Sequence, residues 1–184
     1  KGKPETEITG VSIDSRKIRE GDLFIPIKGE RYDGHDFLEQ AVNSGAKAVL
    51  TGKDVKLSKD NVTVIKVEDT KRALGDLAAY YRLRFNMPFI GITGSVGKTS
   101  TKEMVACVLG QKLNTLKTMG NYNNEIGLPL SVLNLDYSYQ AAVFEMGMSG
   151  FGEIRRLTSI VKPDIAIITN IGMAHIEKLG SRQN

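Results

Sequence analysis

A glycine-rich turn followed by a lysine and a threonine stands near the middle of the chain, directly after the apolar run 89–92. Its residues are, in order, Gly94, Ser95, Val96, Gly97, Lys98, Thr99 and Ser100. Glycine permits positive φ angles and close approach to a ligand, so that backbone N–H groups and a helix start can converge on an anion. Lys98 would then reach nucleotide phosphates while the Thr99 hydroxyl binds magnesium. We therefore expect residues 94–100 to bind ATP and Mg²⁺.

The spacing departs from the common pattern G-x-x-x-x-G-K-[ST]. The first glycine would fall at position 92, which is Ile92, and Gly91 lies one residue too early. The run T-G-x-x-G-K-T that remains indicates a narrower group of ATP-using proteins. The alternative is a glycine-rich turn with an exposed lysine. The order of strand, glycines, Lys-Thr and helix favours the phosphate loop.

Two more residues with suitable chemistry follow apolar runs. Glu145 ends the run 141–144, and His175 lies a few residues past 164–168. Ligands of open parallel sheets bind beyond the carboxyl ends of the strands, so we expect both residues to face one cleft with the loop. The carboxylate would bind the first magnesium ion, and a neutral imidazole could bind a second cation. The alternatives are a surface glutamate and a structural or exposed histidine.

Asparagines are concentrated in the segment 118–125, where they occupy three of the four positions 121–124. Asparagine tolerates left-handed turn geometry, so a purely structural turn is one interpretation. The other is a wall of amide groups that holds a polar substrate.

The elements that would position these residues form two α/β segments. In residues 1–86 we expect strands at 11–14, 23–27, 48–50 and 62–67, and helices at 36–44 and from Asp69 or Thr70 onward. Pro88 should end that second helix, because the residue before a proline avoids helical geometry.

Residues 87–184 should form a parallel sheet with helices. The expected strands are 89–92, 141–144 and 164–168, the last two buried on both faces, and the expected later helices are 128–135 and 153–160. The helix after the loop should pack on the sheet through Met104, Val105, Val108, Leu109 and Leu113. The fold class is therefore α/β.

The composition is that of a globular protein: 184 residues, 41% hydrophobic and 25% charged, with a net charge of +4. This charge suits nucleotides but is too small and scattered to indicate nucleic-acid binding. No apolar run approaches the ~18 residues of a membrane span, and the start resembles no secretion signal. We expect a cytoplasmic protein without membrane insertion, with its one cysteine, Cys107, packed within a helix.

Several runs in matching order resemble the Mur ligases of bacterial cell-wall synthesis. They are TGSVGKTSTKEM, GNYNNEIGLP, FEMGMSGFGEI and TNIGMAHIEKLGS. The run IDSRKIREGDLFIPIKGERYDGHDFLEQAVNSGAKAVL is similar to the uridine-nucleotide-binding domain of that family. STKEM and GNYNNEIGLP are most similar to the members that add D-alanyl-D-alanine.

The resemblance implies a UDP-sugar-binding domain in residues 1–86 and a P-loop, parallel-sheet ATP-binding domain from residue 87 to 184. Because the family has a third domain, we expect this chain to be a fragment cut inside the second one, and inactive on its own. We expect a monomer.

The resemblance also implies the reaction. ATP would phosphorylate the terminal carboxylate of UDP-N-acetylmuramoyl-tripeptide, and the amine of D-alanyl-D-alanine would then attack the acyl phosphate. Lys98, Glu145 and His175 would be catalytic, with Thr99, Glu145 and His175 as metal ligands.

The same resemblance places Ser15 and Arg16 on the UDP moiety, and Asn123 and Asn124 near the reacting carboxylate. Asp33-Gly34-His35 also matches the family pattern, although His35 could equally stabilise its loop.

Two other functions use the same phosphate loop. One is a P-loop phosphotransferase or NTPase, which forms no amide and needs no ligand contact from residues 1–86. The other is a non-enzymatic module in which ATP is a structural ligand.

Overall fold

The computed structural model describes residues 5–181. They fall into two compact units, Lys1–Leu74 and Gly75–Asn184. The division lies inside helix α2 (Thr70–Arg82), ahead of the predicted limit at residue 86. Thr70 Oγ1 donates to the Pro26 carbonyl in the first unit, whereas the Tyr81 hydroxyl donates to the Leu135 carbonyl in the second. The domain limit at 86 and 87 stays a prediction.

The first unit is a four-stranded parallel sheet in the order β1-β2-β3-β4. Its strands are β1 (Gly10–Ser12), β2 (Asp22–Phe24), β3 (Ala48–Thr51) and β4 (Thr63–Lys66). Short 3₁₀ helices η1 (Ser15–Lys17) and η2 (Gly34–Phe37) and helix α1 (Leu38–Asn43) complete it. Each predicted strand of this unit is present, although β1, β2 and β4 are shorter than expected.

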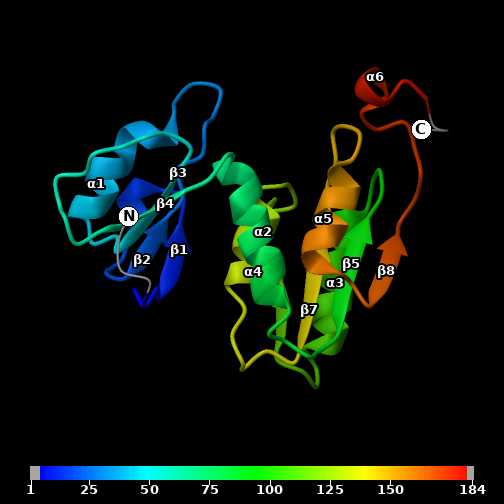
Figure 1. Ribbon diagram of the computed structural model, residues 1–184. Coiled ribbons are helices and arrows are strands. Elements are labelled where there is room, and N and C mark those ends of the chain that lie inside the picture. Colours follow the sequence, from blue (N-terminus) through cyan, green and yellow to red (C-terminus); the bar gives the residue numbers. More distant parts are fainter. Residues whose placement is uncertain (1–4, 182–184) are drawn as a thin grey trace. The chain divides into compact units, whose positions relative to one another are not determined.

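The second unit is a four-stranded parallel sheet in the order β6-β7-β5-β8 (Figure 1). Its strands are β5 (Phe89–Thr93), β6 (Thr115–Lys117), β7 (Ala141–Glu145) and β8 (Ile165–Ile168). Its helices after α2 are α3 (Lys98–Leu109), α4 (Gly127–Leu133), α5 (Glu153–Val161) and α6 (Ile176–Leu179). The sequence analysis missed strand β6 and helix α6.

Alternating side chains of the central strands give this sheet two cores. Phe89 and Phe144 stack with ring centroids 6.1 Å apart, in a cluster with residues of α2, α4 and α5. Ile90, Ile92 and Val143 point to the other face and pack against α3. The period of two is the strand signature, so β5 and β7 are buried on both faces, as predicted for β7.

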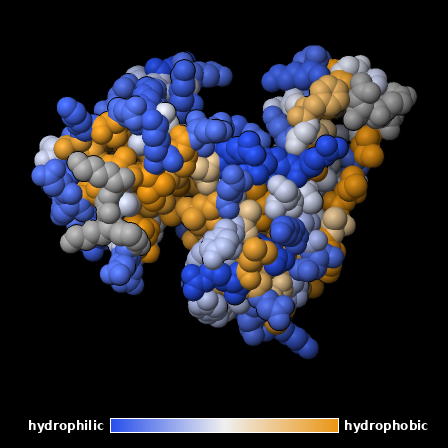
Figure 2. All heavy atoms as spheres, in the orientation of Figure 1, coloured by the Kyte–Doolittle hydropathy of each residue, from blue (hydrophilic) through white to orange (hydrophobic). Residues whose placement is uncertain are grey.

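Strand β8 contradicts the prediction of a strand buried on both faces. It lies at the edge of this sheet and pairs only with β5 among the described strands. Ile165 and Ile168 are 54% and 62% exposed, and Figure 2 shows apolar residues along this edge. Of the β8 side chains, Ile167 packs against the α3 core. The apolar run therefore predicted the presence of this strand correctly, but the prediction that it is buried on both faces is wrong.

Helix α3 also differs from its prediction. Met104 and Val108 are 69% and 72% exposed, and Cys107 is exposed rather than packed. Val105 and Leu109 pack against the sheet core as predicted, together with Ala106 and the buried Lys102, while Leu113 lies beyond the end of the helix. No helix among the described residues is long and apolar enough to cross a membrane.

Candidate functional site

The phosphate loop connects β5 to α3 through residues 94–97. Gly94 and Gly97 have φ angles of 135° and 82°, a region that favours glycine. A Cβ on Gly94 would also overlap the hydroxyl of Thr169, whereas Gly97 has open space around it. Glycine is therefore required at position 97 by the backbone angle alone, and at position 94 by both the backbone angle and the close contact with Thr169.

The start of α3 provides the anion-binding groups. The first hydrogen bond at this end runs from Thr101 N–H to the Gly97 carbonyl. N–H groups in the first turn of a helix have no carbonyl partner within it, and the helix dipole is positive at this end. Residues 98–100 therefore offer donors to a phosphate, as the sequence predicted.

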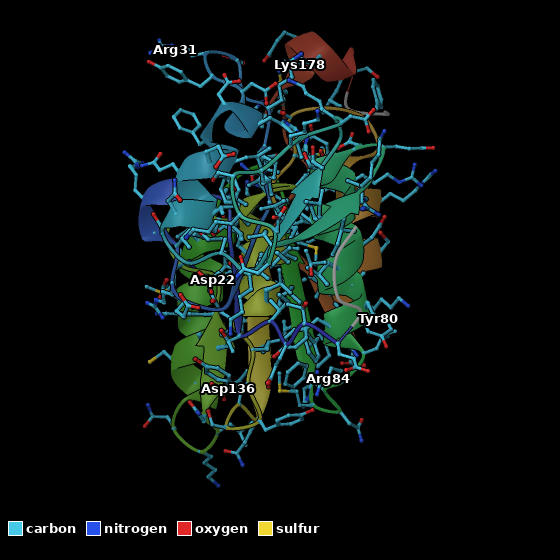
Figure 3. All side chains as sticks on the ribbon, turned by 60° about the vertical axis from the view of Figure 1, so that its left-hand side comes forward. Asp22, Arg31, Tyr80, Arg84, Asp136 and Lys178 are labelled. Atoms are coloured by element: carbon cyan, nitrogen blue, oxygen red, sulfur yellow. The ribbon has the colours of Figure 1, made fainter. Side chains whose placement is uncertain are left out.

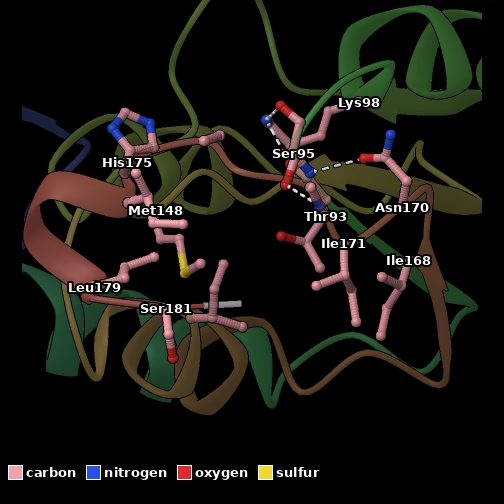
Figure 4. A pocket seen from close by; sticks show the side chains of 15 residues that line it. Thr93, Ser95, Lys98, Met148, Ile168, Asn170, Ile171, His175, Leu179 and Ser181 are labelled. Atoms are coloured by element: carbon pink, nitrogen blue, oxygen red, sulfur yellow. Dashed lines mark hydrogen bonds between the residues drawn. The ribbon is translucent and has the colours of Figure 1, made fainter. Parts of the chain in front are cut away.

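The segment after β8 supports the loop (Figure 4). Asn170 Oδ1 accepts from the N–H groups of Ser95 and Val96 at 3.1 and 3.0 Å. The Thr169 hydroxyl donates to the Val96 carbonyl at 2.6 Å, and Gly172 N–H donates to Ser95 Oγ at 2.8 Å. The loop thus has a defined shape that is held by residues the sequence analysis did not single out.

Lys98 lies against its own loop. Its Nζ donates to the carbonyls of Gly94 and Ser95 at 2.7 and 3.4 Å. These are neutral acceptors, and a phosphate is a much stronger acceptor for an ammonium group. Lys98 therefore sits where it can exchange carbonyl contacts for phosphate contacts.

Glu145 stands at the carboxyl end of β7, in register with Ile92 of β5. It is 2% exposed, which excludes the alternative of a surface glutamate. Oε2 accepts from the Thr99 hydroxyl at 2.9 Å, and Oε1 accepts from Asn123 Nδ2 at 2.8 Å. The prediction that Thr99 and Glu145 lie side by side is therefore confirmed. A hydroxyl and a carboxylate beside a phosphate loop are oxygen donors of the kind that suit Mg²⁺.

Lys102 is a neighbour of Glu145 that the sequence analysis overlooked. Its side chain is 1% exposed, and Nζ donates to the Thr118 carbonyl at 2.9 Å. Nζ also lies 4.0 Å from Glu145 Oε2. The sequence could have indicated this residue, because Lys102 follows Thr99 by about one helical turn and the two side chains therefore share one face of α3.

His175 lines a cavity of about 360 Å³ together with loop residues that include Gly94, Ser95 and Lys98. Figure 4 shows it across this cavity from Lys98, near Met148. It is exposed and has a φ of 57° at the start of α6. No group of three or more His, Cys, Asp or Glu side chains suited to a metal occurs among residues 5–181. Its role as a ligand of a second cation stays a prediction.

The two candidate substrate asparagines have different local roles. Asn123 bonds to Glu145, and its carbonyl accepts from Gly147 N–H at 2.7 Å. Asn124 Oδ1 accepts from the N–H groups of Ile126 and Gly127, which caps the start of α4. The segment 118–125 is therefore both a structured turn and, through Asn123, part of the Glu145 site. Contact of either asparagine with a substrate stays a prediction.

In the first unit, Ser15 and Arg16 line a separate cavity of about 970 Å³. It lies beyond the carboxyl end of β2, where Figure 3 shows Arg31 on the neighbouring loop. Ser15 is buried and donates to Gln40 Oε1 at 2.9 Å.

Arg16 is 79% exposed and forms two 2.9 Å contacts with Asp14. Hydrogen bonds from the Arg16 side chain and backbone lower the pKa of Asp14 to about 2. The guanidinium is thus oriented by a charged neighbour while much of its surface remains open to solvent.

His35 stabilises its loop. Gly52 N–H donates to His35 Nε2 at 3.2 Å, so the ring proton is on Nδ1, which donates to Asp33 Oδ1 at 2.6 Å. Lys53 Nζ contacts the other Asp33 oxygen at 2.7 Å. This arrangement agrees with the structural alternative for His35.

Family models match both parts of the chain. Residues 92–184 match the Mur ligase middle domain, and residues 7–82 match the model described as Mur ligase family, catalytic domain. UDP-N-acetylmuramoyl-tripeptide--D-alanyl-D-alanine ligases are 50% identical over 97% of this chain in Bacillus subtilis and 42% over 95% in Escherichia coli. These matches cover 39% and 38% of those relatives.

Solved structures are similar as well. MurF from Acinetobacter baumannii has a TM-score of 0.90 and 40% identity over 98% of this chain and 39% of its own. MurF ligase from Thermotoga maritima, a complex with ADP, has a TM-score of 0.87 and 39% identity, covering 97% of this chain and 40% of its own. The chain thus spans about two fifths of the length of the relatives it matches.

Proposed function

Because the chain belongs to the Mur ligase family, we propose that it binds ATP and UDP-N-acetylmuramoyl-tripeptide for ligation of the tripeptide to D-alanyl-D-alanine. The observation that carries the proposal is the hydrogen bond between Thr99 and the buried Glu145, directly beside the phosphate loop. The names of the similar ligases of Bacillus subtilis and Escherichia coli support the choice of substrates.

The proposed reaction has two steps. A carboxylate oxygen of the tripeptide attacks the γ-phosphorus of ATP, a new P–O bond forms, and the bond to the β,γ-bridging oxygen breaks as ADP takes its electron pair. The amine of D-alanyl-D-alanine then attacks the acyl carbon, and a C–N bond forms. The C–O bond to phosphate breaks, phosphate leaves with that electron pair, and the amine nitrogen loses a proton.

The residues of the second unit would position and neutralise the reacting groups. Lys98 and the N–H groups of residues 94–100 would bind the β- and γ-phosphates. Thr99 and Glu145 would hold one Mg²⁺, and His175 would help to hold a second. Bound Mg²⁺ supplies charge neutralisation at the transferring phosphoryl group.

The substrates would be held by residues of both units. Asn123 and Asn124 would lie near the reacting carboxylate, while Ser15 and Arg16 would contact the UDP moiety. The cavity around Ser15 and the charge of Arg16 support the second assignment. We also propose that the protein is a monomer and that it acts in the cytoplasm; the second proposal is supported by its use of ATP and a nucleotide sugar.

Binding to the first unit separates this proposal from a phosphotransferase or a structural ATP module. Isothermal titration of the chain with UDP-N-acetylmuramoyl-tripeptide should give saturable binding that Arg16→Ala weakens by about tenfold or more, the loss expected for charged contacts to a diphosphate. Lys17→Ala, next along the chain and absent from the cavity lining, is the matched control. Binding of ATP without binding of the UDP-peptide would contradict the proposed ligase function and favour a phosphotransferase or a structural ATP module.

Turnover can be tested in a chimera in which residues 1–184 replace the matching segment of the Bacillus subtilis relative. Phosphate release should require UDP-tripeptide and D-alanyl-D-alanine together. Release that is independent of D-alanyl-D-alanine would instead indicate an NTPase.

A further inference from the structure

Lys102 is the buried cation of the second unit that the proposed reaction does not use. It belongs to α3 and follows Thr99 by three residues, so one helix directs both side chains toward Glu145. Moving an ammonium group out of water is costly unless it is paired and hydrogen-bonded. Its 1% exposure therefore requires a compensating environment.

The compensation comes from one carbonyl and two carboxylates. Nζ donates to the Thr118 carbonyl at 2.9 Å and lies 3.1 Å from Glu103 and 4.0 Å from Glu145. Glu103 is 47% exposed and also pairs with Lys117. Lys117, Glu103, Lys102 and Glu145 thus alternate in sign and have no net charge. Lys102 lies closer to Glu103 than to Glu145, but Glu103 is half exposed and has Lys117 as a second partner. Among the ion pairs of the described residues, Lys102 is the one cation within 4.0 Å of the buried Glu145.

Lys102 also fixes the position of Glu145. Thr118, whose carbonyl accepts from Lys102, uses its hydroxyl to accept from the backbone N–H of Glu145 at 3.0 Å. The carboxylate itself is held by Thr99 and Asn123. The buried carboxylate is therefore oriented and balanced before any cation arrives.

We propose that Lys102 is a positioning residue whose buried ammonium is the permanent counter-ion of Glu145, so that a divalent cation enters this site only together with the nucleotide phosphates. The inference rests on the proposed metal role of Thr99 and Glu145. A free dication is repelled by the Lys102 ammonium, which lies 4.0 Å from Glu145, whereas nucleotide phosphates add the negative charge that overcomes this repulsion. Thr99 and Glu145 supply only two of the oxygen ligands that Mg²⁺ requires, so nucleotide phosphates would complete the site.

Electron paramagnetic resonance of Mn²⁺ tests this inference without turnover. The unmodified chain should bind Mn²⁺ with ATP and not without it. Lys102→Met keeps the length of the apolar stem and removes the charge, so nucleotide-free Mn²⁺ affinity should rise by about tenfold or more. The double variant Lys102→Met, Glu145→Gln should lose this new site, which would locate it at Glu145.

Lys117→Met is the matched control, because it removes a lysine that pairs with Glu103 and not with Glu145, and it leaves the Lys102 ammonium beside Glu145. It should leave nucleotide-free binding unchanged. Lys102→Arg retains the charge and should also bind no Mn²⁺ without ATP. Circular dichroism checks whether Lys102→Met is folded. If it is not, Lys102→Gln, which is neutral but can still donate a hydrogen bond, replaces it in the same experiment.

The outcomes separate this inference from the proposed function. If the unmodified chain binds no Mn²⁺ even with ATP, the metal role in the proposed function fails. If it binds Mn²⁺ only with ATP and the folded neutral variants behave identically, Lys102 is a structural residue and this inference is overturned. Nucleotide-free binding by the unmodified chain would overturn it as well.

Discussion

The hydroxyl of Thr99 donates to Glu145 Oε2 across 2.9 Å and thereby joins the first turn of α3 to the carboxyl end of β7. The two residues are 46 positions apart in the chain. Parallel pairing of β5 with β7 brings the start of α3 and the end of β7 to the same edge of the sheet.

Removal of the Glu145 charge should abolish most of the magnesium dependence of ATP binding. Glu145→Gln keeps the side-chain shape but gives a weaker oxygen donor, so the gain in ATP affinity on adding Mg²⁺ should fall by about tenfold or more. Calorimetric titrations with and without Mg²⁺ measure this gain. Asp136→Asn, which removes an exposed carboxylate from the segment that precedes β7, is the control. An unchanged gain in Glu145→Gln would remove Glu145 from the metal site.

Gly97→Ala should distort the phosphate loop. The φ of 82° costs a residue with a Cβ about 1 kcal/mol or more, and no neighbouring atom needs to move. We expect ATP affinity to fall by about tenfold if the loop changes its angle. Gly29→Ala, at a position with an ordinary contact and no positive φ, should leave ATP binding unaltered. Equal affinities for both variants would contradict the requirement for glycine at 97.

The contacts of Asp33 with Lys53 and His35 should make the stability of the first unit fall at acidic pH. Hydrogen bonds from Lys53 and His35 hold the pKa of Asp33 below its ordinary value of 3.8. A lowered acid pKa gives stability that is present above pH 3.8 and is lost as the pH falls below it. Asp33→Asn should therefore be less stable than the unmodified chain at pH 6, and the difference should shrink toward pH 2. Chemical unfolding followed at several pH values checks this, and a difference independent of pH would contradict it.

The stacked aromatic pair predicts a large stability effect in the second unit. Phe144 is fully buried against Phe89, so Phe144→Ala should lower the free energy of unfolding by about 3–5 kcal/mol. Phe151→Ala is the control, because it makes the same chemical change at a side chain that is 65% exposed. It should lower the free energy of unfolding by less than about 0.5 kcal/mol. Denaturant titrations that give similar losses for both would contradict the described packing.

Asn170→Ala should loosen the phosphate loop without unfolding the sheet. The Val96 N–H loses its side-chain acceptor, so its hydrogen exchange should accelerate by about tenfold or more. The Ser95 N–H keeps a 3.1 Å hydrogen bond to the Asn170 carbonyl and should accelerate less. The amide of Gly91, in the middle of β5, is the internal control and should exchange at an unchanged rate. Unaltered exchange at Val96 would show that the Asn170 side chain does not maintain the loop.

Local patterns in the sequence predicted the strands and the position of the chemistry well. The glycines at 94 and 97, the apolar run before them and the carboxylate at the end of β7 each follow from a local rule. Parallel-sheet geometry then places them together without knowledge of side-chain contacts. The α/β class and the parallel sheet of the second unit were therefore predictable.

Features that depend on tertiary neighbours were not predictable in the same way. Hydrophobicity assigned Met104 and Val108 to the sheet-facing side of α3, but the helix buries Lys102 because Thr118 and Glu145 supply its partners. The exposure of β8 depends on its place at the sheet edge, which the composition of a strand does not encode. Strand β6 (Thr115–Lys117) has a single apolar residue, Leu116, between two polar ones, so it contains no apolar run.

The support that residues 169–172 give to the phosphate loop also affects the thermodynamics of ligand binding. Hydrogen bonds from this segment fix the backbone of Ser95 and Val96 when the chain folds. The loop therefore loses its conformational entropy during folding rather than during binding. A nucleotide that enters this site would meet an ordered loop, and more of its interaction energy would remain to hold the phosphates in one orientation.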